Sequence, residues 1–491
     1  MPYDRVCAAK ANVPHVPEVA VIRSIHILFS SLLLLIPASP SAAQRGTAGP
    51  PQTVEVIENI TLIDGRGGPP VADAAVVVRD GRIVAAGPRA TIDAPADARR
   101  VDGHGGFLVP GFIDAHAHIA LGPLRLTPTD SGVSLGMDHD PDGSRITLRL
   151  LLANGITTIR DPGGPAERTV ALRDSVAAGQ LVGPRMVVAG EIIDRTPFAG
   201  LTTTVTTADD VRAEVRRQAE IGVDIIKLYH ALTPELTGAG IDEAHRLGLP
   251  AITHPMLTTW TEAAALGVDG IVHILGWSPR MLPEGKRDEF LAMLGSTQFM
   301  YGWLELADLD SPEIRNAITA LVEHDVILDP TLVVFERAVG GDDVAITGNA
   351  ALVLAPPALV ANWRSSFRFD LGWSADDYRR AREAWPKALS LTKRLFDAGV
   401  ILAAGTDANN PWIVPGESFH RELELLVDAG ISPLDVLTIA TRNGAMAAGL
   451  LDDTGTIEPG KRADLVLLRD DPVAAISATR SIVWVMKHGT R

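Results

Sequence analysis

Two histidines stand one residue apart in the stretch GFIDAHAHIA, where His116 and His118 follow a short apolar run. The run is typical of a buried strand, and side chains two residues apart in a strand point the same way. Both imidazoles are therefore expected on one face. Such a pair is either two core histidines satisfied by hydrogen bonds or half of a metal site, because imidazole is a common ligand of zinc and other first-row metals.

Four further residues of ligand type follow at the ends of later apolar runs. Lys227 lies in DIIKLY, His254 in PAITHP, His273 in GIVHIL and Asp407 in GTDA. Each alone has an ordinary structural explanation: a core histidine, a lysine paired with an acid, or an aspartate in a turn. Their recurrence at the ends of successive predicted strands favours one shared site.

The elements that must position these residues are short strands separated by helices. Eight apolar runs are predicted strands, at residues 112–119, 157–161, 185–193, 224–230, 250–255, 270–275, 326–334 and 400–408. Amphipathic stretches separate most of them, and several end in glycine, as helices often do. Eight strand–helix repeats predict an α/β fold with a (β/α)8 TIM-type barrel, in which the carboxyl ends of the strands meet at one mouth.

Both ends of the mature chain are rich in predicted strands, and the Asp80-Gly81 pair is typical of a hairpin turn. We expect these ends to form one small β-sandwich domain beside the barrel. A long insertion at 335–376 interrupts the barrel pattern and is typical of a lid or pocket wall. The predicted parts are a signal peptide (1–43), a linker (44–52), the small β-domain (53–110 and 451–491) and the barrel (111–450).

The N-terminal residues have the features of a signal peptide. Arg23 precedes the apolar run IHILFSSLLLLIPA, and small residues follow it. A bilayer-spanning helix needs about 20 apolar residues, so this run is short for a permanent anchor. We expect an exported protein, periplasmic or secreted, with no stable membrane partner after cleavage. The single cysteine, Cys7, precedes the run, so a metal in the mature chain would be held by histidine, carboxylate or lysine.

The charge of the chain limits its partners. A formal net charge of −16 argues against nucleic acid or an anionic membrane as the partner, because few cations are left to neutralise phosphates. We expect a small-molecule substrate instead. Assembly into a homo-oligomer is left open.

The whole constellation resembles the amidohydrolase superfamily. The matching pieces are PGFIDAHAH, the lysine of DIIKLY, His254, GVDGIVHI with His273, GTDA and the tail GTIEPGKRADLVLL. Together they cover roughly residues 53–491. Within the superfamily, KLYHALTPE and SFHRELELLVDAGISPLDVLTIATRNGA are similar to the imidazolonepropionase-like branch, which includes Xaa-Pro dipeptidases.

The resemblance implies two divalent metal ions, and the donor set favours zinc. The implied ligands are His116, His118 and Asp407 for the more buried ion, His254 and His273 for the second, and Lys227, carboxylated by carbon dioxide, as the bridge. Burial lowers the pKa of a lysine and leaves a neutral amine that can react with carbon dioxide.

The implied activity is hydrolysis of an amide-type C–N bond in a dipeptide, an N-acyl amino acid or a cyclic amide. A hydroxide bridging the two ions would attack, and Asp407 would carry the proton to the leaving nitrogen. An ester, lactone or phosphotriester hydrolase could use the same residues, since fold does not determine the substrate. A catalytically silent binding protein and a site with one ion are further alternatives.

Three more residues are candidate substrate contacts. Tyr229 lies two residues beyond Lys227 and should share its direction. His139 lies in the loop MDHDPDG, and Arg160 ends the second predicted strand beside Asp161. The structural alternatives are a packed tyrosine, a loop histidine and an ion pair between Arg160 and Asp161.

Overall fold

The computed structural model describes residues 54–129 and 132–491, with the side chains of 129–133 left aside. The predicted signal peptide, the linker and Cys7 lie outside the described residues. The described residues belong to one compact unit. Within them, no helix combines the length and the apolar character needed to cross a membrane.

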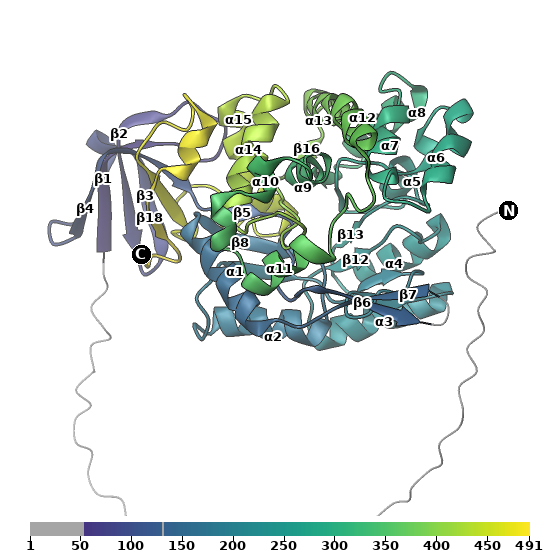
Figure 1. Ribbon diagram of the computed structural model, residues 1–491. Coiled ribbons are helices and arrows are strands. Elements are labelled where there is room, and N and C mark those ends of the chain that lie inside the picture. Colours follow the sequence, from purple (N-terminus) through teal and green to yellow (C-terminus); the bar gives the residue numbers. More distant parts are fainter. Residues whose placement is uncertain (1–53, 130–131) are drawn as a thin grey trace, which may run out of the picture. The chain divides into compact units, whose positions relative to one another are not determined.

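Both ends of the described chain join in one six-stranded sheet (Figure 1). Its order is β18-β17-β4-β1-β2-β3, and only the β1–β4 pair is parallel. The strands are β1 (Val54–Leu62), β2 (Val71–Arg79), β3 (Arg82–Pro88), β4 (Arg99–Pro110), β17 (Leu465–Leu468) and β18 (Ile482–Met486). Asp80 and Gly81 have φ of 50° and 77° in the β2–β3 turn, as a two-residue hairpin requires. The strands form a single sheet, whereas a sandwich of two sheets was expected.

The remaining strands, apart from one hairpin, are parallel. One sheet has the order β5-β8-β9 and another has the order β11-β10-β12-β13-β14-β15-β16. Main-chain bonds connect the two sheets at both sides: the Ala115 N–H donates to Ala404 O (2.8 Å) and the Asp224 N–H donates to Val188 O (2.8 Å). The strands are β5 (Phe112–Asp114), β8 (Ile156–Asp161), β9 (Arg185–Val188), β10 (Ile192–Asp194), β11 (Thr202–Thr204), β12 (Ile226–Leu228), β13 (Ala251–Thr253), β14 (Gly270–Val272), β15 (Ile327–Asp329) and β16 (Ile401–Leu402), with the hairpin β6 (Leu124–Thr129) and β7 (Gly132–Met137).

Helices alternate with most of the parallel strands, as the sequence predicts. Helix α3 shows why: a capping box between Thr207 and Asp210 starts it, Val211 and Val215 face the core, and Gly222 ends it with φ 97°. The α-helices are α1 (Pro141–Ala153), α2 (Ala166–Ala177), α3 (Ala208–Ile221), α4 (Pro234–Arg246), α5 (Trp260–Ala265), α6 (Arg287–Met293), α7 (Phe299–Leu306), α8 (Pro312–Glu323), α9 (Leu332–Val339), α10 (Val344–Thr347), α11 (Pro357–Ser365), α12 (Ala375–Ala384), α13 (Pro386–Ala398), α14 (Glu417–Asp428), α15 (Pro433–Thr438) and α16 (Gly444–Ala447). The short 3₁₀-helices are η2 (Arg89–Thr91), η3 (Pro279–Met281), η4 (Glu284–Lys286), η5 (Ala350–Val353) and η7 (Ile476–Arg480), and η6 (Ile439–Asn443) is a short π-helix.

Most observed strands are shorter than predicted, and the predicted strand at 400–408 is reduced to β16 (Ile401–Leu402). The run 326–334 was wrong in its second half, because β15 ends at Asp329 and helix α9 begins at Leu332. Pro330 has no N–H to continue the ladder, and an apolar run alone does not distinguish a buried strand from a buried helix. The run 185–193 is two strands, and β5 ends at Asp114, before the paired histidines.

The insertion at 335–376 is mostly helical and packs on neighbouring loops. Asn362 of α11 accepts from the Leu124 N–H and donates to Leu124 O, both at 2.9 Å, which attaches α11 to the β6–β7 hairpin. Trp363 is buried in a small apolar cluster that includes Trp412, from the loop after Asp407. The insertion is therefore fastened at two places.

We predict that Gly111→Ala destabilises the fold. A Cβ atom at Gly111 would lie 2.1 Å from Thr157 Oγ1, and the Gly111 N–H donates to Asp464 O at 2.8 Å, so the backbone cannot readily move. Overpacking of this kind costs about 1–3 kcal/mol. Chemical denaturation should show the loss. Gly285→Ala is the control, because no described atom lies within 4 Å of that Cβ; equal midpoints for both variants would contradict the prediction.

Candidate metal centre

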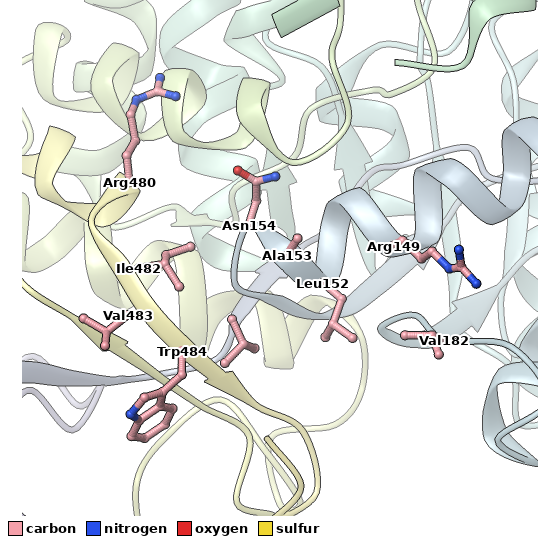
Figure 2. A pocket seen from close by; sticks show the side chains of 10 residues that line it. Arg149, Leu152, Ala153, Asn154, Val182, Arg480, Ile482, Val483 and Trp484 are labelled. Atoms are coloured by element: carbon pink, nitrogen blue, oxygen red, sulfur yellow. The ribbon is translucent and has the colours of Figure 1, made fainter. Parts of the chain in front are cut away.

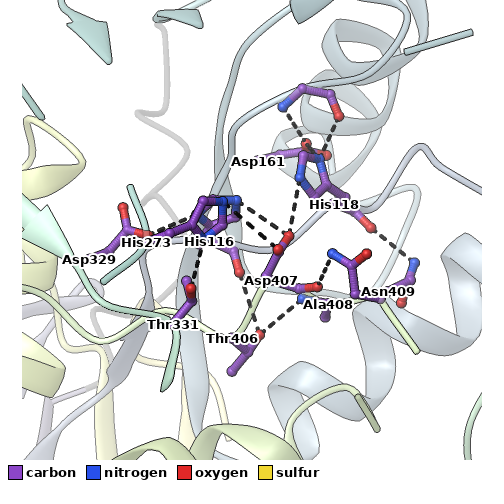
Figure 3. Close-up of polar contacts among 12 residues, drawn as sticks. His116, His118, Asp161, His273, Asp329, Thr331, Thr406, Asp407, Ala408 and Asn409 are labelled. Carbon is purple, nitrogen blue, oxygen red and sulfur yellow. Dashed lines mark hydrogen bonds and ion pairs between the residues drawn. The ribbon is translucent and has the colours of Figure 1, made fainter. Parts of the chain in front are cut away.

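Three imidazoles converge on the carboxylate of Asp407 (Figure 3). Nε2 of His116 and Nε2 of His118 each lie 3.4 Å from Asp407 Oδ1, and Nε2 of His273 lies 4.0 Å from Oδ2. Ligand atoms of His116, His118 and Asp407 all lie within 4.8 Å of one another. Two donors on a tetrahedral zinc, each about 2.1 Å from the ion, lie roughly 3.4 Å apart. The spacing therefore fits a shared cation.

The outer nitrogen of each of these imidazoles has its own protein partner. Nδ1 of His118 donates to Gly163 O at 2.8 Å, Nδ1 of His116 lies 2.8 Å from the Asp329 carboxylate, and Nδ1 of His273 lies 2.7 Å from Thr331 Oγ1. A proton on Nδ1 leaves the Nε2 lone pair free toward the centre. Metal-binding histidines are commonly oriented in this way.

Lys227 and His254 are buried beside this group without partners. Lys227 is 1% exposed and His254 is 3% exposed. Neither Nζ of Lys227 nor either ring nitrogen of His254 has a hydrogen-bond partner among the described residues. The His254 ring lies 4.6 Å from the His273 ring, centroid to centroid, and stacks on Trp277 at 5.1 Å. Buried polar atoms without partners are costly, so this arrangement calls for a ligand, and a bound cation would satisfy one ring nitrogen of His254.

The electrostatics keep most of these side chains neutral. Burial lowers the pKa of Lys227 to about 7 and that of His273 to about 3. Burial, followed by nearby positive charge, holds the pKa of His116 and of His254 well below the usual range. The pKa of His118 is raised instead. Burial alone would lower it, but the hydrogen bond and the negative charge of Asp407 outweigh that effect. Neutral imidazole is the form that binds a metal.

The backbone is strained at several residues of the centre. Asp407, His273, Thr331 and Trp277 have φ of 58°, 71°, 46° and 40°, in the left-handed region. Such residues cost of order 1–3 kcal/mol each and cluster at functional sites. The strain is consistent with side chains held in one required geometry.

Asp329 is a member of the site that the sequence predictions missed. Its carboxylate contacts His116 on one oxygen and the Arg160 guanidinium on the other. It ends strand β15 in ILDP, at the same strand-end position as the predicted ligands, and this position was the signal that could have found it. Arg160 also donates to Ala115 O and Ala447 O. Arg160 is thus buried beside the centre. It pairs with Asp329 instead of Asp161, the partner expected from the sequence.

The two other candidate substrate contacts lie in different places. Tyr229 follows strand β12, and its ring lies 4.9 Å from the His254 ring, so it borders the centre. His139 is an exposed residue of the loop between β7 and α1. The structure therefore groups Tyr229 with the six ligand-type residues and places His139 on the surface.

A separate cavity of about 610 Å³ lies between the end of α1 and strand β18 (Figure 2). Its lining residues are Arg149, Leu152, Ala153, Asn154, Val182, Arg480, Ile482, Val483, Trp484 and Val485. None of the predicted site residues is among them. The cavity therefore belongs to another part of the surface than the histidine cluster.

Comparisons with known proteins show the family and the fold that this chain shares. Residues 107–491 match the model of the amidohydrolase family. The imidazolonepropionase of Agrobacterium fabrum is 27% identical over 425 residues, which is 82% of this chain and 86% of that protein. This relative confirms the predicted resemblance to the imidazolonepropionase-like branch.

Solved structures share the fold. Bottromycin amidohydrolase superposes with a TM-score of 0.66 at 24% identity and covers 89% of this chain and 86% of its own. A Xaa-Pro dipeptidase with bound methionine gives 0.64 at 20% identity and covers 89% and 99%. The family match and these neighbours imply a TIM barrel, as the strand–helix repeats predict.

We predict that His116→Asn lowers metal content by about one ion per chain, because the shorter side chain removes an Nε2 donor from the cluster. Elemental mass spectrometry of the purified protein measures this directly. His139→Asn makes the same change on the surface and should keep the parental metal content. Unchanged stoichiometry in His116→Asn would show that the cluster is not a metal site.

Proposed function

The chain belongs to the amidohydrolase family, and from this premise we propose that it hydrolyses an amide-type C–N bond in a small molecule with two divalent ions. The observation that carries the proposal is the set of unpaired buried nitrogens of Lys227 and His254 beside the converging His116, His118 and Asp407. A dipeptide, an N-acyl amino acid or a cyclic amide is the proposed substrate. Imidazolonepropionase and Xaa-Pro dipeptidase among the similar proteins support this class.

We assign the ligands by position. His116, His118 and Asp407 would hold the first ion, and His254 and His273 the second. Lys227 would bridge them as a carbamate: its neutral amine adds to carbon dioxide, forms an N–C bond and loses a proton. Burial without a partner supports this, because it favours the neutral amine. Nitrogen and oxygen donors without a thiolate suit zinc.

Bound ions of this kind acidify a water molecule and polarise the scissile carbonyl. Asp407 is the residue placed to move the proton. Its N–H donates to His116 O at 2.7 Å, which holds its backbone, and its side chain is 11% exposed, so one carboxylate edge can meet a substrate. It would accept the proton of the attacking water and deliver it to the leaving nitrogen.

Tyr229 is the substrate contact that we retain, because its ring borders His254. The proposal does not extend to His139, which is exposed, or to Arg160, whose guanidinium is committed to Asp329. We further propose that the parallel strands close into an eight-stranded barrel, supported by the Ala115–Ala404 bond. Export, directed by residues 1–43, remains part of the proposal.

We predict that the metal-loaded protein hydrolyses members of a panel of dipeptides, N-acyl amino acids and cyclic amides, and that chelation stops turnover. Each amide is paired with an ester or lactone of the same acyl group, and a phosphotriester is included. Amide turnover detected by release of the amine supports the proposal. Ester, lactone or phosphotriester turnover without any amide turnover would overturn it.

We predict that Lys227→Ala loses bound metal and turnover, and that acetate restores part of both. The vacated space can accept a short carboxylate, which supplies the bridging oxygens that a carbamate would provide. Lys227→Met fills the same space and should not be rescued. Metal content and turnover, measured with and without acetate, are the readouts. Parental metal content in Lys227→Ala would contradict the bridging role.

A further inference from the structure

Thr331, the residue that precedes helix α9, has a conformation that few residues of its type adopt. Its φ and ψ are 46° and 47°, and the left-handed region is strongly disfavoured for a β-branched residue. A threonine at this position of a helix normally turns its hydroxyl to the first N–H groups. Thr331 makes no such bond within the described chain. Its Oγ1 lies instead 2.7 Å from Nδ1 of His273.

The first N–H groups of α9 are bound by a residue from another helix. Glu422 of α14 accepts from the Leu332 N–H at 3.0 Å with one oxygen and from the Val333 N–H at 2.7 Å with the other. Its side chain is wholly buried. A carboxylate at a helix N-terminus is favoured by the helix dipole. Glu422 therefore serves as the cap that Thr331 does not provide.

A second contact joins the same two helices. Arg421, the neighbour of Glu422, pairs with Glu336 of α9, with Nη2 and Nε at 2.8 Å and 3.1 Å from Oε1. Helix α14 also follows the loop after β16, which contains Asp407. Helix α14, which follows the proposed ligand Asp407 in the chain, therefore holds helix α9. The residue before α9, Thr331, contacts the proposed ligand His273.

We propose that Glu422 is a positioning residue of the metal centre: by capping α9 it leaves the hydroxyl of Thr331 free to orient His273. This inference rests on the proposed metal centre. Glu422 touches no ligand directly and acts only through Leu332, Val333 and Thr331. Without the Glu422 side chain, the hydroxyl of Thr331 can turn to the N–H groups at the start of α9. Its contact with His273 is then lost.

The test compares metal affinity in variants of the full chain. Zinc-loaded protein is titrated with a competing chelator. The His273→Asn variant shows which of the two ions depends on His273 and therefore serves as the reference. We expect Glu422→Gln to weaken the binding of that ion by about 10–100-fold, as loss of an outer partner of a metal ligand does. The other ion should stay bound. Gln offers one acceptor oxygen to two N–H groups, so it cannot replace the carboxylate.

Ser311→Ala is the matched control. Ser311 caps α8 by accepting from the Ile314 N–H at 3.3 Å, so its loss removes a helix cap away from the centre and should leave both ions in place. Thr331→Ser keeps the hydroxyl and should bind like the parent, whereas Thr331→Val should match Glu422→Gln. These Thr331 variants test the same path if Glu422→Gln does not fold.

The double variant Glu422→Gln with Thr331→Val should be no weaker than either single variant, because both changes act on one path. Parental affinity in Glu422→Gln, or fully additive losses in the double variant, would overturn the positioning role while leaving the metal centre intact. A parent chain that binds no ion would overturn the proposed function, and this inference with it.

Discussion

The burial of polar side chains without partners is the constraint on which the rest of this structure depends. Lys227 and His254 place three nitrogen atoms in the interior with no hydrogen-bond partner in the described chain. A protein can bury such groups only if something outside the chain satisfies them or if it tolerates a large loss of stability. The convergence of His116, His118 and Asp407 beside them supports the proposal that bound cations occupy this region. Parallel strands bring these residues together because their carboxyl ends meet.

An outer layer of contacts sets the direction of the inner side chains. Asp329, Gly163 and Thr331 each hold one imidazole by its Nδ1 atom. Arg160 neutralises Asp329, which is fully buried, and Glu422 releases Thr331 from helix capping. His254 differs, because its ring is held by stacking on Trp277 rather than by a hydrogen bond. The second proposed metal site therefore combines one imidazole held by a hydrogen bond, His273, with one held by stacking, His254.

Local sequence patterns pointed to the six ligand-type residues. Contacts between distant parts of the chain could not be predicted from such patterns. The two-residue spacing of His116 and His118 and the positions of the other ligand-type residues near strand ends were visible because extended-chain geometry is local, although β5 itself ends before the two histidines. The partners of Arg160 and Thr331 come from distant elements, so no spacing reveals them. The strand predicted at 326–334 failed for a similar reason: Glu422, about ninety residues away, binds the N–H groups that start α9.

The most direct test of the account is anomalous diffraction at the zinc edge from crystals of the zinc-loaded protein. Two peaks are expected. One should lie among His116, His118 and Asp407 and the other beside His254 and His273, with electron density extending Lys227 into a carbamate between them. A single peak, no peak, or peaks away from these residues would contradict the central claim that these side chains hold two metal ions.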